Sequence, residues 1–152
     1  MSWVSITSTA DLEHYVVAAL VRAINEAALG DTQTDRFTRV NSDVTALVRM
    51  SVASNSENVL DSDTTKIPQS LRSDACWIIA WMMAMGLGIE LTDQQSNEVA
   101  NARERLQQVA RGSLTIEKPD TEDTEPDGQS GAGIEMIEGN DRVFTVSTMN
   151  GL

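Results

Sequence analysis

The stretch at residues 67–88, IPQSLRSDACWIIAWMMAMGLG, decides the fold of this chain. Pro68 suits the first position of a helix, where its missing N–H costs nothing. Over residues 71–87 apolar side chains occur on nearly every side, and a helix of this kind is buried all round. Gly86 and Gly88 are placed to end it. The sequence therefore predicts a central helix that other polypeptide must cover.

Two helices are predicted before this stretch. The first covers residues 10–29, with Ser8 or Thr9 accepting the free N–H groups at its start and Gly30 closing its end. The second covers residues 36–59, where valines and a leucine keep helical spacing but serines and asparagines dilute the pattern. In the first helix, one face carries apolar residues at steps of three and four: Leu12, Val16, Ala19, Leu20, Ala23, Ile24 and Ala27.

A fourth helix is predicted after the central one. Thr92 and Gln95 form a T-x-x-Q capping box at its start, since each side chain can bind the other residue's backbone N–H. Its apolar stripe is narrow, and Gly112 stops it. Residues 1–112 are thus expected to form a helical bundle.

The chain changes character beyond this bundle. Residues 113–152 carry nine Asp or Glu against Lys118 and Arg142. We expect residues 113–133 to be an acidic flexible linker, because the stretch 120–133 has no large apolar residue to offset the entropy of folding. A short strand could form within this part, at residues 114–117. Apolar residues return at 134–152, which predicts an arm that docks elsewhere.

Composition supports an all-α fold: a small four-helix bundle with an extended C-terminal arm and room for short β segments. Aromatic residues make up only 4% of the 152 residues, so the core must be mostly aliphatic, which favours helix-on-helix packing. The longest uncharged stretch, residues 75–89, is shorter than the roughly 20 residues of a membrane-spanning helix. The first residues lack the pattern of a signal peptide. We therefore expect a protein of the reducing cytoplasm that contacts no membrane.

Few residues could carry chemistry. The net charge of −12 and the scattered Lys and Arg argue against clamping of nucleic acid. His14 is the only histidine, without a partner at a helpful spacing, and Cys76 lies in the most apolar stretch, where we expect an inert thiol. The acidic run at 120–128 departs from the calcium-loop pattern, so we favour a solvated linker over a weak cation site. The sequence predicts no catalytic residues, no metal and no cofactor.

The central helix carries the candidate site instead. Tryptophans and methionines at helical spacing could hold a cofactor, but they more often form a core or an interface. A domain of this size rarely surrounds one helix completely, so part of the surface should await a partner chain. The expected subunit and partner contacts are Trp77, Trp81, Met82 and Met85 on the helix, and Ile134, Met136, Ile137, Arg142, Phe144, Met149 and Leu152 on the arm.

The order of these features resembles a known family. A helix opened by T-S-T-A-D-L at residues 7–12 is followed by V-T-A-L at 44–47, and I-P leads into L-R-S-D-A at 71–75. A polar helix ending L-Q-Q-V-A-R-G at 106–112 precedes a β-like L-T-I, and R-V-F at 142–144 comes before the ending T-M-N-G-L. In this order the chain is similar to the head–tail adaptor, or connector, proteins of tailed bacteriophages, particularly those of Mu-like phages.

The resemblance implies a structural role in the virion. Proteins of this family are helical bundles that form a ring, usually twelvefold, beneath the portal vertex. The ring extends the DNA channel and offers a surface to the stopper or tail-completion protein, while DNA passes through without sequence-specific binding. The resemblance therefore implies a homo-oligomer, a portal partner and a place in the neck of the virion after assembly in the host cytoplasm.

A second hypothesis stays open. An acidic helical protein could mimic DNA and occlude a basic site on a host protein. Such a mimic should display its carboxylates on the folded surface, whereas over half of the net charge of this chain lies in residues 113–152. An obligate monomer with affinity for one host enzyme would favour mimicry, and rings or portal complexes would favour the adaptor.

Overall fold

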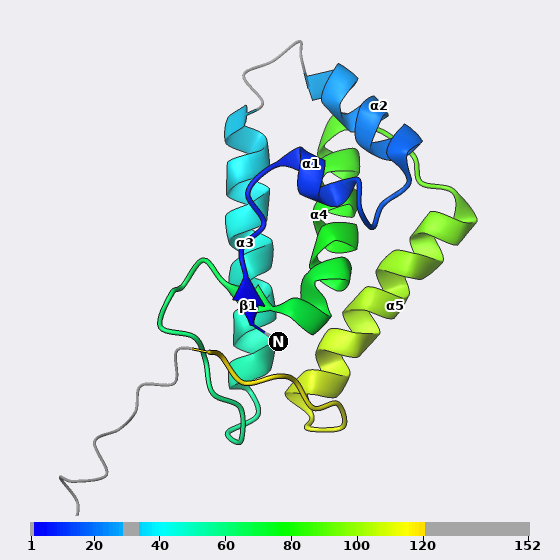
Figure 1. The fold of residues 1–152 in the computed structure, drawn as a ribbon. Helices are drawn as coiled ribbons and strands as arrows, with labels where there is room; N and C mark the ends of the chain where they lie inside the picture. Colours follow the sequence, from blue (N-terminus) through cyan, green and yellow to red (C-terminus); the bar gives the residue numbers. More distant parts are fainter. Residues whose placement is uncertain (1, 29–33, 121–152) are drawn as a thin grey trace, which may run out of the picture. The chain divides into compact units, whose positions relative to one another are not determined.

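The structure, a computed structural model, describes residues 2–28 and 34–120, in which helices pack around a central helix (Figure 1). Four of the described helices have seven or more residues, and a pair of two-residue strands accompanies them. The prediction of an all-α, four-helix core is confirmed. The elements in chain order are β1 (Trp3–Val4), α1 (Thr9–Leu12), α2 (Ala18–Ala28), α3 (Thr34–Ala53), β2 (Ile67–Pro68), the 3₁₀ turn η1 (Gln69–Leu71), α4 (Arg72–Leu87) and α5 (Asp93–Ala110).

The central helix is α4, which packs against α1, α2, α3 and α5. Nine of its residues are buried, among them Cys76, Ile79 and Met83, and this explains why its sequence is apolar on nearly every side. It ends at Gly88, whose φ of 71° is the left-handed conformation favoured at a helix end. Gly86, by contrast, lies inside the helix.

The helix begins later than the sequence predicts. Pro68 does not open it, because Ile67 and Pro68 pair with β1 in an antiparallel register that sets Trp3 opposite Pro68 and Val4 opposite Ile67. The pairing holds Pro68 in an extended conformation, with ψ of 135°. One 3₁₀ turn then separates the strand from Arg72, the first residue of α4.

The first predicted helix is two helices in the structure. The chain leaves the helical path after Leu12 and resumes it at Ala18. Both α1 and α2 contact α4, and the break buries Val16 while leaving Val17 51% exposed. A single straight helix over this range was therefore the wrong prediction, because periodicity alone does not show a change of direction. Gly30, predicted to end the helix, lies outside the described residues.

The second predicted helix, α3, ends at Ala53 rather than at residue 59. Side chains that follow the helix bind carbonyl groups of its last turn: the Ser54 hydroxyl donates to the carbonyl of Met50, and the Asn58 amide donates to the carbonyl of Val52. These bonds satisfy the last carbonyls of the helix, so the chain can turn away. The following loop returns to α3 at Arg49, which donates to the carbonyl oxygens of Asp61, Asp63 and Lys66.

The fourth predicted helix, α5, is confirmed at both ends. The Thr92 hydroxyl accepts a hydrogen bond from the backbone N–H of Gln95, and the Gln95 side chain accepts one from the N–H of Thr92. Gly112 follows the helix with φ of 78°. Of the helices in the described ranges, none is long and apolar enough to cross a membrane.

The residues that follow α5 lie on the core. Leu114 and Ile116 pack against the buried cluster and Pro119 is buried. Glu117 accepts hydrogen bonds from the Trp3 indole at its carbonyl and from Ser70 at its carboxylate. We therefore place the end of the core at residue 120 rather than at 112, and no strand forms at residues 114–117.

Candidate interaction surface

The four α4 residues predicted to contact a partner differ in exposure. Trp77 is only 9% exposed and belongs to the core, so a partner could reach only a small part of its ring. Trp81 and Met82 are partly buried and pack against the core from outside it. Met85 is 63% exposed, the largest exposed fraction among the large apolar side chains described. The free surface of α4 is therefore near its C-terminal end.

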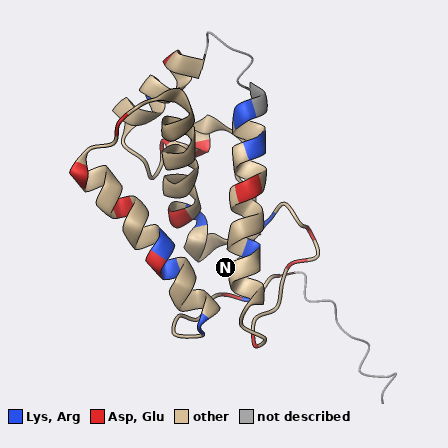
Figure 2. Ribbon diagram, turned by 180° about the vertical axis from the view of Figure 1, so that it is seen from behind, with Lys and Arg blue, Asp and Glu red and all other residues tan. Residues whose placement is uncertain are grey.

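Two arginines lie over the C-terminal half of α4, the part that carries Met85. The Arg103 guanidinium, from α5, lies 5.4 Å from the ring centre of Trp81, one helical turn before Met85. The Arg36 guanidinium, from α3, lies over Gly86, where a Cβ would be 2.8 Å from its Nη1 atom. A positive charge is favourable there because α4 ends nearby with the negative end of its dipole. Figure 2 shows basic residues on α3 and α5, whereas the part of α4 after Asp74 carries no charged residue.

A hollow of about 450 Å³ lies where the turn between α1 and α2 meets α4 and the start of α5. The exposed edge of Trp77 contributes to its lining, together with Tyr15, Val17 and the first residues of α5. Glu98 also lines it, so the hollow combines aromatic and aliphatic surface with a carboxylate.

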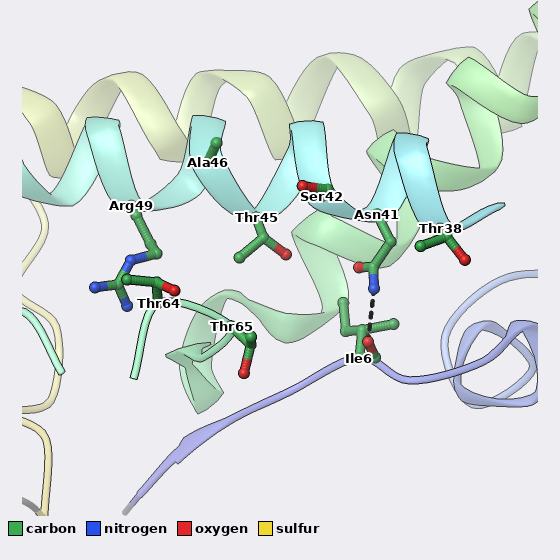
Figure 3. Close-up of a pocket in the computed structure, with 9 residues that line it drawn as sticks. All are labelled: Ile6, Thr38, Asn41, Ser42, Thr45, Ala46, Arg49, Thr64 and Thr65. Carbon is green, nitrogen blue, oxygen red and sulfur yellow. Dashed lines mark hydrogen bonds between the residues drawn. The ribbon is translucent and has the colours of Figure 1, made fainter. Parts of the chain in front are cut away.

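A second hollow, of about 460 Å³, lies between α3 and the segments around Ile6 and Thr65 (Figure 3). Hydroxyl groups dominate its polar lining, with Thr38, Ser42 and Thr45 all contributed by α3. The Asn41 amide donates to the carbonyl of Ile6 at 2.7 Å, which ties the N-terminal segment to α3. This groove holds no acid or base that could activate a substrate.

Arg49 closes one end of this groove but is fully engaged. Its guanidinium donates to three backbone carbonyls and also lies 5.5 Å from the ring centre of Trp3. These contacts hold the loop at residues 61–66 and the N-terminal strand against α3. Arg49 therefore has a structural role and is not available to bind an anion.

The one deeply buried carboxylate of α4 is Asp74. It is 1% exposed, and its single charged contact is an ion pair at 3.3 Å with Arg105 Nε on α5. Burial raises the pKa of Asp74 to about 6, a rise that Arg105 opposes and the nearby Glu98 adds to. Neither of its oxygen atoms accepts a hydrogen bond. Asp74 is thus an electrostatic cost inside the α4–α5 interface.

The remaining reactive residues are placed as the sequence indicated. Cys76 is buried, and burial raises the pKa of its thiol to about 12, which leaves it un-ionised at neutral pH. His14 is exposed, with its ring centre 6.4 Å from that of Tyr15 in an edge-to-face arrangement. Within residues 2–28 and 34–120, no three His, Cys, Asp or Glu side chains converge as a metal site would require.

Sequence reasoning missed several residues of this surface. Val17 does not belong to the apolar face predicted for the first helix. This position off the apolar face was the only sequence feature that indicated an exposed side chain. Arg36 and Arg103 gave no signal, because their positions beside α4 depend on contacts between helices. The predicted arm contacts at Ile134, Met136, Ile137, Arg142, Phe144, Met149 and Leu152 lie outside the described residues.

Comparisons of this chain with protein-family models, curated proteins and solved structures found no match.

Proposed function

We propose that this chain is a non-enzymatic structural subunit of a homo-oligomeric assembly, of the kind represented by the head–tail adaptors of tailed phages. In this role it forms a ring, contacts a portal protein on one side and a stopper or tail-completion protein on the other, and resides in the neck of the virion. DNA passes through the ring without being bound by sequence.

The observation that carries the proposal is the exposure of large apolar side chains on the folded core. Met85 and Val17 are 63% and 51% exposed, and they lie on two different parts of the bundle, near the end of α4 and just before α2. A repeated contact between copies would remove such side chains from water, at roughly 1.5–3 kcal/mol for each that becomes fully buried. The order of sequence features described above points to the same role.

The chemistry of the described residues agrees with a role in assembly. The thiol is buried, the single histidine is exposed, and the hydroxyl-lined groove has its arginine committed to backbone carbonyls. A catalytic site needs an acid or base and an activated group in one cavity. Neither hollow combines them.

The test is assembly with the portal protein from the same genome. We expect the full chain to form ring-shaped complexes on the portal, visible by negative-stain electron microscopy and with a mass of several subunits by light scattering. Deletion of residues 134–152 should leave the helical circular dichroism signal unchanged but prevent portal binding. A chain that remains monomeric, ignores the portal and binds one host enzyme tightly would contradict the proposal and favour DNA mimicry.

A further inference from the structure

The Met85 surface has the properties of a projecting contact. Its side chain is 63% exposed near the end of α4, and in sequence it lies between Trp81 and Gly86, each of which has an arginine over it. Methionine is unbranched and flexible, and its thioether makes favourable contacts with aromatic rings. An exposed methionine therefore suits insertion into an irregular, aromatic-lined cavity.

The hollow around Trp77 has a lining that suits an inserted methionine. Its lining includes the aromatic rings of Tyr15 and Trp77 and the exposed aliphatic side chain of Val17. Its volume of about 450 Å³ leaves room for a side chain from another molecule. The Met85 surface and this hollow share no residue, so one molecule can use both at once.

The charges around the two features are opposite. Arg103 and Arg36 lie over the part of α4 that carries Met85, whereas Glu98 lines the hollow, and Asp93 lies in sequence between two of the lining residues, Thr92 and Gln94. The negative charge of Glu98 also repels the buried carboxylate of Asp74. An arginine placed opposite Glu98 would offset this repulsion. Complementary charges of this kind steer two surfaces together and fix their register.

We propose that Met85 of one copy of this chain inserts into the Val17–Trp77 hollow of a second copy, with Arg36 and Arg103 facing Glu98 and Asp93. The contact is head-to-tail, because it joins two different surfaces. Repetition of such a contact builds a closed ring when the rotation closes and an open chain when it does not. The inference rests on the proposed function, for which it supplies the contact between neighbouring subunits.

Two variants of the full chain test the contact from its two sides. Met85→Asp damages only the projecting side chain, and Val17→Asp damages only the hollow. Both positions are more than half exposed, so both variants should fold. Val17→Asp should leave the free energy of unfolding unchanged, whereas Met85→Asp should lower it by about 1 kcal/mol, because aspartate is a poor helix former and its charge lies near the negative end of the α4 dipole. Urea unfolding followed by circular dichroism checks both. Met50→Asp is the matched control, because Met50 is 62% exposed on α3, 14 residues or about 20 Å beyond Arg36.

Sedimentation velocity over a range of concentrations gives the readout. We expect the wild-type chain and Met50→Asp to associate beyond a dimer. Met85→Asp and Val17→Asp should each lower the association constant about tenfold or more, because a carboxylate would have to enter an apolar contact. An equimolar mixture of these two variants should form a one-to-one dimer, because one partner keeps the methionine and the other keeps the hollow.

Four results would overturn the inference: a wild-type chain that stays monomeric, a wild-type chain that stops at a dimer, variants that associate like the wild type, or a mixture that stays monomeric. Failure of the inference is distinguishable from failure of the proposed function. If Met85→Asp still forms rings on the portal, only the proposed contact is contradicted. If no portal complex forms with the wild-type chain, the adaptor role is contradicted.

Discussion

Arg72 and Asp11 form an ion pair that joins the N-terminal segment to the central helix, with Arg72 Nη2 2.9 Å from Asp11 Oδ1. The other oxygen of Asp11 accepts hydrogen bonds from the backbone N–H groups of Thr7 and Ser8. Burial raises the pKa of Asp11, but these hydrogen bonds and Arg72 outweigh it and hold the pKa below its usual value. One carboxylate thus begins α1 and fixes it to α4.

Replacement of Asp11 should therefore be costly. We expect Asp11→Ala to lower the free energy of unfolding by about 2 kcal/mol, because it removes a helix cap and a partly buried ion pair together. Urea denaturation followed by circular dichroism measures this. Since the lowered pKa gives stability that is present above pH 3.8 and lost as the pH falls through the folded value, the two curves should converge in strong acid. Glu26→Ala, on the exposed side of α2, is the control and should change little.

The raised pKa of Asp74 predicts the opposite dependence on pH. Its folded pKa of about 6 lies above the ordinary 3.8, so the folded state binds the proton more tightly than the unfolded state does. The contribution of Asp74 to the free energy of unfolding is therefore greatest below about pH 4 and is lost as the pH rises through 6. Asp74→Asn should be more stable than the wild type at pH 7.5, by at most about 3 kcal/mol, and equal to it near pH 4. A less stable variant at pH 7.5 would mean that the ion pair with Arg105 outweighs the burial.

The two glycines near the end of α4 should respond oppositely to alanine. Gly88→Ala should cost about 1 kcal/mol, because its φ of 71° strains any side chain although nothing lies within 4 Å of the added Cβ. Gly86→Ala should be neutral or stabilising by up to about 1 kcal/mol, because alanine favours the helix and the atom it meets is the flexible end of Arg36. Thermal unfolding of the pair is the measurement. Equal losses at both positions would show that Arg36 cannot move.

The segment after α5 should be necessary for the core. We expect a chain ending at residue 120 to unfold with the same free energy as the full chain. A chain ending at residue 112 should lose about 3 kcal/mol, because Leu114 and Ile116 no longer cover the core and the Trp3 indole loses its acceptor. Urea unfolding distinguishes them. Equal stability of the two truncated chains would contradict the packing described for this segment.

The sequence was most informative where the signals are local. The start of α5 follows from Thr92 and Gln95 alone, since both partners of the capping box lie within one turn. The burial of α4 follows from its lack of a polar side. The break between α1 and α2 was not predictable in this way, because both helices pack against α4, which lies far from them in sequence.

The interaction surface was only partly predictable from the sequence, because it depends on contacts between helices that are distant in the chain. The pattern of α4 identified an apolar helix but could not tell that Trp77 would be covered and Met85 left in water. That difference arises because neighbouring helices cover α4 unequally along its length. The hollow around Trp77 is built from three separate segments, so no spacing of residues in the sequence could predict it.

The position of Trp3 ties together the two sequence ends of the described core. Its indole is 3% exposed and donates to the carbonyl of Glu117, 114 residues later in the chain. Closing so long a loop is slow compared with local helix formation. The contact between Trp3 and Glu117 is thus expected to form late in refolding, after the helices have formed.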